Sequence, residues 1–396
     1  MTHDKAIQLD SQYIMGTYGR YPLVPASASG SMITDENGKK YIDFTSGIGV
    51  NSLGWCDEGW LRAVTGQLGK FQHISNYFVS VPTAELAKEL VTRSGLRKAF
   101  FGNSGAEANE GAIKTARKYS SDRYPDRPNR RTIVSLDRSF HGRTITTLAA
   151  TGQDVFHRHF DPFTAGFKYS PLNDICALKS ALTADVCAVI AEPVQGEGGV
   201  NIMTAEFASA LRQLCDERDL LLIFDEIQTG IGRTGTLFSF EQYVKPDILT
   251  LAKGLGGGLP VGAFVCGEKC ASVLGSGMHG TTFGGNPVVA AGACEVLSRI
   301  TSGGFLASVR EKGAYIRSAL ASKNLPVKDI RGLGMMIGIE VADGLSHKEI
   351  ARTAFDRGLL VLTAGSNVVR LLPPLNITYE DIDAGIGILA GCFEKA

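Results

Sequence analysis

Two apolar runs that end in charged residues carry the first sign of chemistry in this sequence. Residues 220–224 lead into Asp225, and residues 248–252 lead into Lys253. Short apolar runs of this kind predict buried strands of a parallel sheet, and open α/β sheets bind ligands beyond the carboxyl ends of their strands. Asp225 and Lys253 would then face one crevice, as pyridoxal phosphate requires: a lysine for covalent attachment and an acid for its pyridinium nitrogen. Taken alone, the two residues have another interpretation, in which Asp225 caps a helix and Lys253 ends a solvated strand.

The composition is that of an ordinary globular protein. The 396 residues are 44% hydrophobic and 20% charged, a length that corresponds to about two to three domains. Forty basic residues balance forty acidic ones, so the charge indicates neither nucleic acid nor an anionic membrane as a partner. No apolar run approaches the ~18 residues of a membrane span, and the N-terminus lacks the apolar core of a signal peptide.

The cysteine and histidine spacing favours no metal site. Eight cysteines are scattered along the chain, and only Cys266 and Cys270 lie close, with no second pair to complete a zinc site. His157 and His159 form a cluster with no spaced acid or thiol, which is typical of a surface. We therefore expect buried, reduced thiols in a cytoplasmic protein without a metal.

The periodicity predicts an α/β chain with a further lobe. Strand-like runs on either side of the Asn37-Gly38 pair indicate a hairpin. Helical and strand patterns alternate from about residue 55. In the last hundred residues we expect a helix at 309–320 and strands at 331–340, 359–362 and 369–375. The predicted organisation is an N-terminal arm with part of a small domain (1–55), a large mostly parallel sheet domain with helices on both faces (56–290) and a C-terminal small α+β domain (291–396).

A turn of small residues predicts an anion site. The strand-like run 98–101 leads through Ser104, Gly105 and Ala106 into a helix that continues to Tyr119. Unpaired N–H groups and the positive end of the helix dipole at such a turn bind phosphate. The alternative is an ordinary strand-to-helix connection.

Two further strand ends carry polar or aromatic residues to the same edge. Phe140 and Arg143 follow the strand 131–136, where an aromatic ring can stack on a planar cofactor and a guanidinium can bind a carboxylate. Glu192 and Glu197 follow the strand 186–191. The sequence therefore predicts a site with several acids and at least one arginine.

Together these pieces resemble the class III (ω-) aminotransferases of pyridoxal phosphate fold type I, over nearly the whole chain. The resemblance is closest to the members of that family that act on acetylornithine. One departure is the segment 53–59, where relatives often show a Leu-Gly-His then His-Pro pattern and this chain reads Leu-Gly-Trp-Cys-Asp-Glu-Gly. The motifs that carry the resemblance are 103–109, 140–144, 192–199, 225–230, 252–254 and 281–287.

The resemblance implies roles for individual residues. Lys253 holds the cofactor and shuttles the proton between substrate and cofactor, and Asp225 keeps the ring nitrogen protonated. Thr282 reaches the phosphate of the neighbouring subunit, which makes a homodimer part of the active site. The remaining implied cofactor contacts are Ser104, Gly105, Ala106, Phe140, Glu192 and Gln228.

The substrate contacts follow from charge. We expect Arg143 to bind the distal carboxylate in both half-reactions and Arg370 to bind the α-carboxylate of glutamate or 2-oxoglutarate. Glu197 would neutralise Arg370 while the ω-amine substrate is bound, since an unpaired buried arginine is costly. A fixed structural ion pair is the alternative. Tyr18 and Thr281 complete the predicted substrate contacts.

The activity that the resemblance implies is ping-pong transfer of the δ-amino group of N2-acetyl-L-ornithine to 2-oxoglutarate. Ornithine, succinyl-diaminopimelate, 4-aminobutyrate or an acyl-lysine are alternative donors. More distant alternatives are a racemase or aminomutase, and a catalytically inactive relative that serves as a binding protein.

Overall fold

The computed structural model describes residues 1–394, and its largest element is a seven-stranded sheet. The strand order is β4-β12-β11-β10-β7-β5-β6, and neighbouring strands are parallel except where β12 pairs antiparallel with β11 and β4. The mostly parallel sheet that the sequence predicts is therefore confirmed. Its strands are β4 (Lys98–Gly102), β5 (Thr132–Leu136), β6 (Phe167–Ser170), β7 (Val186–Ala191), β10 (Leu221–Asp225), β11 (Ile248–Leu251) and β12 (Gly262–Cys266).

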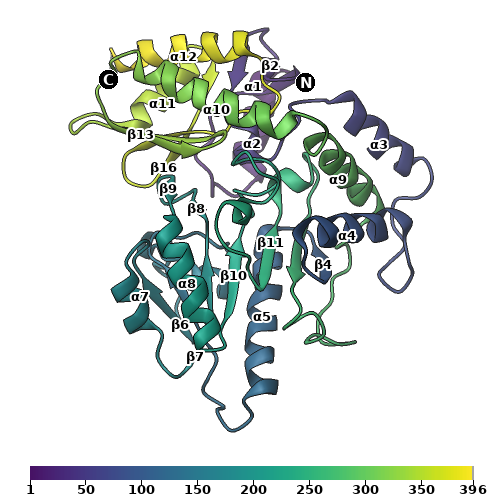
Figure 1. The fold of residues 1–396 in the computed structure, drawn as a ribbon. Helices are drawn as coiled ribbons and strands as arrows, with labels where there is room; N and C mark the ends of the chain where they lie inside the picture. The colour runs from purple at the N-terminus through teal and green to yellow at the C-terminus, as the bar shows by residue number, and fades with distance from the viewer. Residues whose placement is uncertain (395–396) are drawn as a thin grey trace.

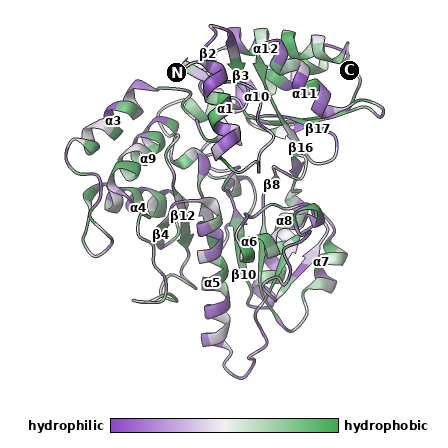
Figure 2. Cartoon of the chain, turned by 180° about the vertical axis from the view of Figure 1, so that it is seen from behind, coloured by the Kyte–Doolittle hydropathy of each residue, from purple (hydrophilic) through white to green (hydrophobic). Residues whose placement is uncertain are grey.

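Helices cover both faces of this sheet, as Figure 1 shows. The helix α5 packs on one face against β12 and β11, and α7 and α8 lie over β6 and β10. Hydrophilic and hydrophobic residues alternate along α5 (Figure 2), as expected for a helix with one buried face. The helix α3 packs on α9 beside the sheet. The helices of this part of the chain are α3 (Glu58–Leu68), α4 (Val81–Ser94), α5 (Gly105–Arg123), α6 (Ile145–Ala150), α7 (Ile175–Ala181), α8 (Ala205–Glu217) and α9 (Pro287–Ile300), with 3-10 turns η1 (Asp154–Phe156), η2 (Ser239–Gln242) and η3 (Lys253–Leu255).

The N-terminal and C-terminal elements lie together in the upper part of Figure 1. The C-terminal strand β15 pairs in parallel with β3 of the N-terminal sheet, whose order is β1-β2-β3-β15. A second sheet, β13-β14-β17-β16, lies beneath α10, α11 and α12. The N-terminal elements are α1 (His3–Tyr13), β1 (Pro25–Ser29), β2 (Met32–Asp35), β3 (Lys40–Asp43) and α2 (Ser46–Gly49). A hairpin joins β8 (Val194–Gln195) to β9 (Asn201–Ile202). The C-terminal elements are α10 (Phe305–Ala321), β13 (Val327–Leu333), β14 (Met336–Val341), α11 (His347–Asp356), β15 (Leu359–Leu360), β16 (Leu362–Ala364), β17 (Val368–Leu371) and α12 (Tyr379–Phe393).

The expected strands of the C-terminal region need correction. The single strand predicted at 331–340 is the hairpin β13–β14, which turns at Gly334 with a left-handed φ of 52°. The strand predicted at 359–362 is two: β15 joins the N-terminal sheet, whereas β16 pairs with β17. The strand predicted at 369–375 ends at Leu371, before Pro373 and Pro374, which lack the N–H that a ladder requires.

Other predictions hold more closely. The hairpin around Asn37-Gly38 is β2–β3, and the helix expected after Pro287 is α9. All eight cysteines are free, but Cys56 and Cys176 are exposed, so the expectation of buried thiols is wrong for these two. Within residues 1–394, no group of three or more candidate ligands could hold a metal ion, and no helix is long and apolar enough to cross a membrane.

Candidate active site

A cavity of about 480 Å³ opens at the carboxyl ends of the parallel strands. Asp225 ends β10, Lys253 follows β11, and Glu192 follows β7. Parallel strands present these ends at one edge, which explains why residues far apart in the sequence meet here. The lining residues are Val50, Asn103, Ser104, Gly105, Ala106, Phe140, His141, Gly142, Arg143, Glu192, Glu197, Asp225, Ile227, Gln228, Ala252, Lys253, Gly258, Leu259, Pro260 and Val261.

The Asp225 carboxylate is buried and fixed by three hydrogen bonds. His141 Nδ1 lies 2.7 Å from Asp225 Oδ2, and Asn109 Nδ2 donates to the same oxygen at 2.7 Å. The backbone N–H of Ile227 donates to Oδ1 at 3.0 Å. Asp225 therefore presents a carboxylate in a fixed position to the cavity.

Lys253 presents an amine to the same cavity from a strained backbone. Its φ is 41°, in the left-handed region that non-glycine residues rarely adopt and that is common at functional sites. Burial lowers the pKa of the Lys253 ammonium, and the Arg370 charge adds to this effect, while the Glu197 carboxylate opposes it. A lowered pKa gives a larger fraction of neutral, nucleophilic amine at neutral pH.

The turn before α5 is built for an anion. Ser104 caps the helix by accepting from the Glu107 N–H, so the N–H groups of Gly105 and Ala106 lie in the first turn, where helical partners are missing. A Cβ on Gly105 would lie 2.7 Å from Ile227 Cδ1, so this position requires glycine. The 19-residue helix directs the positive end of its dipole at the cavity.

Glu192 orders the segment that carries Phe140. Its carboxylate accepts from the Phe140 N–H at 2.8 Å and from the Gly196 N–H at 3.2 Å. Burial raises the pKa of this carboxyl, and the charge of Asp225 adds to the shift. The two hydrogen bonds to Glu192 fix the backbone of the loop after β5, and Phe140 of this loop lines the cavity.

Arg143 lies on the face of an aromatic ring. Its Cζ is 3.9 Å from the ring centroid of Phe156 and 5.5 Å from that of Phe140. A guanidinium over an aromatic face is held by the ring quadrupole and keeps its N–H donors free for a carboxylate.

Glu197, Gln228 and Arg370 form one hydrogen-bonded group. Arg370 is buried in β17, and its Nη1 donates to Glu197 Oε1 at 2.8 Å and to Gln228 Oε1 at 3.0 Å. Gln228 Nε2 donates to Glu197 Oε1 at 3.3 Å. Burial opposes ionisation of Glu197, but the Arg370 and Lys253 charges outweigh it and lower the pKa of the carboxyl. The lowered pKa keeps Glu197 ionised beside Arg370, and Arg370 Nε has no hydrogen-bond partner within residues 1–394.

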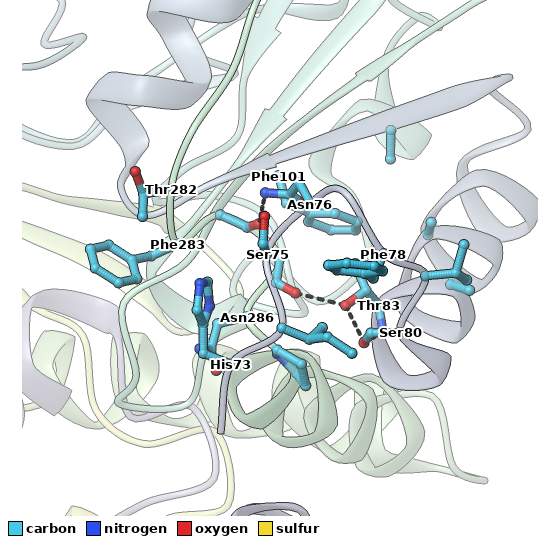
Figure 3. Close-up of a pocket in the computed structure, with 18 residues that line it drawn as sticks. His73, Ser75, Asn76, Phe78, Ser80, Thr83, Phe101, Thr282, Phe283 and Asn286 are labelled. Carbon is cyan, nitrogen blue, oxygen red and sulfur yellow. Dashed lines mark hydrogen bonds between the residues drawn. The ribbon is translucent and has the colours of Figure 1, made fainter. Parts of the chain in front are cut away.

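Four predicted residues do not line the cavity: Arg370, which contacts the lining residues Glu197 and Gln228, and Thr281, Thr282 and Tyr18. Thr281 Oγ1 accepts from Asn103 Nδ2 at 3.2 Å, and Thr282 lies at the edge of a neighbouring pocket with His73 and Phe283 (Figure 3). Tyr18 is exposed, with its ring 5.6 Å from Arg20 Cζ.

Sequence reasoning missed the residues that hold Asp225. His141 and Asn109 belong to motifs that the sequence displays, but nothing in their spacing connects either residue to an acid more than eighty positions later. One signal was available: Asn109 lies one helical turn after Gly105, on the buried side of an amphipathic helix, where a polar residue needs a partner.

The residues present fit pyridoxal phosphate. A buried carboxylate with three donors, an amine of lowered pKa and a helix N-terminus that requires glycine face one cavity, and they match its pyridinium nitrogen, aldehyde and phosphate. The fold and the site thus define a pyridoxal phosphate-dependent transferase.

The chain belongs to the class III aminotransferases, since the family model described as "Aminotransferase class-III" matches residues 14–393. The acetylornithine aminotransferase of Haemophilus ducreyi is 53% identical over 393 residues, which cover 98% of each chain. The crystal structure of N-acetylornithine aminotransferase from Stenotrophomonas maltophilia has a TM-score of 0.84 and 38% identity, covering 98% of each chain. A structure of ornithine aminotransferase from Toxoplasma gondii, described with partial occupancy of PLP at its active site, has a TM-score of 0.95 and 32% identity, covering 99% of this chain and 94% of that one. The family and fold that the sequence predicts are confirmed, and the cofactor is pyridoxal phosphate.

Proposed function

We propose that this enzyme transfers the δ-amino group of N2-acetyl-L-ornithine to 2-oxoglutarate, giving N-acetylglutamate 5-semialdehyde and glutamate. The observation that carries the proposal is the disposition of charge around Lys253. Arg143 lines the cavity and offers a carboxylate site, whereas Arg370 contacts the lining residues Glu197 and Gln228, and its charge is paired with Glu197. A donor with an amine far from its carboxylate fits the first site without disturbing the second.

The acids of the cavity already accept hydrogen bonds from the protein, and this favours an acylated donor. Glu192, Glu197 and Asp225 are the acids among the described residues that line the cavity, and each already accepts at least two hydrogen bonds. The α-ammonium of free ornithine would therefore lie near Arg143 without a counter-charge, at a Coulombic cost. The acyl group of N2-acetylornithine removes that charge. The relatives named for acetylornithine support the same donor.

The side chains divide the work of proton transfer and charge stabilisation. When bound, pyridoxal phosphate supplies the electron-accepting ring that stabilises negative charge at the substrate carbon. Lys253 Nζ removes the proton from that carbon and returns a proton during transfer. Asp225, fixed by His141 and Asn109, holds a proton at the pyridine nitrogen. Phe140 stacks on the ring, and Gly105 and Ala106 donate their N–H groups to the phosphate with Ser104.

The second half-reaction requires Arg370. Glutamate and 2-oxoglutarate carry a carboxylate beside the reacting carbon, and we infer that it takes the place of Glu197 on Arg370. Gln228 Oε1, already 3.0 Å from Arg370 Nη1, keeps the guanidinium oriented during the exchange. Because Glu197 is only partly buried, its side chain can move toward solvent when displaced.

The enzyme is proposed to act as a homodimer. Apolar side chains lie exposed near two loops that are joined by hydrogen bonds from Asn76 to the Thr281 and Gly284 carbonyls. Phe78 and Phe283 from the two loops line one pocket (Figure 3). Exposed apolar side chains that gather in this way favour an interface. Thr282 lies within it and would reach the phosphate of the second copy, with Thr281 and Tyr18 near the substrate. The exposed apolar residues are Tyr77, Phe78, Val79 and Phe283 on the loops and Val81 at the start of α4. Eight free cysteines are consistent with a reducing, cytoplasmic location.

A comparison of donors tests the proposal. With 2-oxoglutarate as the acceptor, we expect kcat/KM for N2-acetylornithine to exceed that for ornithine, since only ornithine brings an uncompensated charge. Arg143→Met should raise KM for both. If the enzyme prefers ornithine, succinyl-diaminopimelate or 4-aminobutyrate, the proposed donor is wrong, but the proposal of transamination is retained.

A further inference from the structure

The segment from Gly275 to Thr282 is an exposed loop that needs external anchors. Gly275, Gly277 and Gly280 have no atom within 4 Å of an added Cβ, and Met278 is 47% exposed. Glycines in open space lose much conformational entropy when a loop is ordered. The loop borders a hollow of about 1000 Å³ that is also lined by Phe100 and Lys114. Within the loop, Gly275 and Met278 are joined by the Met278 N–H to the Gly275 carbonyl at 3.2 Å and by the Gly275 N–H to Met278 Sδ at 3.5 Å, so the position of the loop on the protein depends on its contacts with other elements.

One anchor is Lys114, which lies on the third turn of α5. Its Nζ donates to the Met278 carbonyl at 2.9 Å and lies 3.0 Å from His279 Nδ1. An ammonium has donors and no acceptor, so Nδ1 must be the unprotonated, accepting nitrogen of a neutral imidazole. Burial and the Lys114 charge lower the pKa of His279, which is consistent with this state.

The His279 ring completes this anchor from the side of the sheet. Its centroid is 4.7 Å from that of Phe100 on β4 and 5.9 Å from that of Phe264 on β12. Aromatic pairs at such distances contribute beyond the area that they bury. The loop is thereby fixed to a strand and a helix that both lead into the proposed cofactor site.

The second anchor follows two residues later. Asn103, at the start of the phosphate turn, donates from Nδ2 to Thr281 Oγ1, and its N–H donates to Glu107 Oε2 on α5. Thr282 is the next residue along the chain, and its side chain is free to reach outward (Figure 3). Two fixed points with Gly280 between them set the position of Thr282.

We propose that Lys114 and His279 form a clamp that presents Thr282 to the phosphate ester of the cofactor bound by a second copy of this chain. The clamp rests on the proposed role of Thr282 in the homodimer and extends it. Lys114 and His279 are positioning residues, since neither lines the cavity. The helix that receives phosphate at its first turn thus also carries, on its third turn, the residue that orders the loop donated to the partner.

Lys114→Met in the holoenzyme tests the clamp, with Lys118→Met as the matched control. Lys118 lies one turn further along α5 and pairs with Asp122 at the surface. We expect amide hydrogen exchange in residues 275–282 to accelerate about tenfold in Lys114→Met, as for loss of a hydrogen bond to a charged group. The dissociation constant for pyridoxal phosphate should rise about tenfold by the same reasoning. Lys118→Met should change neither quantity.

The outcomes separate the clamp from the role of Thr282. Unchanged exchange in residues 275–282 of Lys114→Met would overturn the clamp, whatever Thr282→Ala does. If Thr282→Ala leaves cofactor affinity unchanged, the proposed phosphate contact is wrong, and accelerated exchange would then support only the anchoring. His279→Asn serves as a second variant should Lys114→Met fold poorly, and it should accelerate exchange of the same peptide.

Discussion

Replacing Glu197 by glutamine should separate the two half-reactions. The substitution keeps the shape of the side chain and removes the charge that covers Arg370 at 2.8 Å. Removing one partner of a buried ion pair costs ~3–5 kcal/mol. Arg370 keeps its hydrogen bond to Gln228 and Glu197 is partly exposed, so we take ~2–3 kcal/mol, or about 30- to 150-fold in rate. This penalty falls on the ω-amine half-reaction, during which Arg370 has no other anion.

The glutamate half-reaction should respond differently. In the proposed mechanism the α-carboxylate of glutamate replaces Glu197 on Arg370, so Glu197→Gln would remove a competitor and should leave the rate unchanged or raise it. The assay is single-turnover absorbance of the cofactor after mixing the enzyme with N2-acetylornithine or with glutamate separately. Equal losses in both half-reactions would refute the switch and indicate a fixed structural ion pair. Arg212→Gln, which weakens the partly exposed pair with Asp247 far from the cavity, is a control that should alter neither rate.

Three further predictions follow from individual residues. Lys253→Met should abolish transamination. It should also raise the Tm of the cofactor-free protein at neutral pH, because the lowered pKa of Lys253 shows that a charged amine at this buried position destabilises the fold. An unchanged or lower Tm would contradict this reasoning. Tyr77→Glu should convert the proposed dimer to monomer in sedimentation experiments, since this side chain beside the loop 281–284 is 95% exposed, and an intact dimer would show that the interface lies elsewhere. Because the pKa of Glu197 is lowered, the stability that its pair with Arg370 contributes is fully present above the ordinary carboxyl pKa of about 4.3 and is lost as pH falls through the lowered pKa. The difference in Tm between the unmodified enzyme and Glu197→Gln should therefore be constant from about pH 8 to about pH 5 and become smaller in more acid solution. A difference that becomes smaller between about pH 8 and about pH 5 would contradict this prediction.

Much of the fold follows from local sequence signals because each is strong by itself. The buried strands β10 and β11 are continuous apolar runs, and α9 begins at the proline that the sequence marks. The C-terminal hairpin was missed because 331–340 reads as one apolar stretch, and the left-handed turn at Gly334 is fixed by packing against the backbone of Thr234. Likewise, β15 pairs with β3, more than three hundred residues earlier in the chain, although β16 follows it directly. No local sequence pattern predicts such a distant pairing.

The candidate site divides in the same way. Asp225 and Lys253 were predictable because a carboxylate and an amine at adjacent strand ends share one edge, and this follows from topology alone. Two hydrogen bonds were not predictable, because they depend on how side chains from separate segments meet. They are the bond between His141 and Asp225 and the bond that Arg370 donates to Gln228. The anchoring of the loop 275–282 by Lys114 was beyond the sequence for the same reason.

The most direct test of the account is the single-turnover reaction of the unmodified enzyme with each donor. We predict that N2-acetylornithine changes the cofactor absorbance faster than ornithine, succinyl-diaminopimelate or 4-aminobutyrate, and that 2-oxoglutarate then restores it. A cofactor absorbance that no amine donor changes in the fully loaded enzyme would contradict the proposal that this cavity carries out transamination.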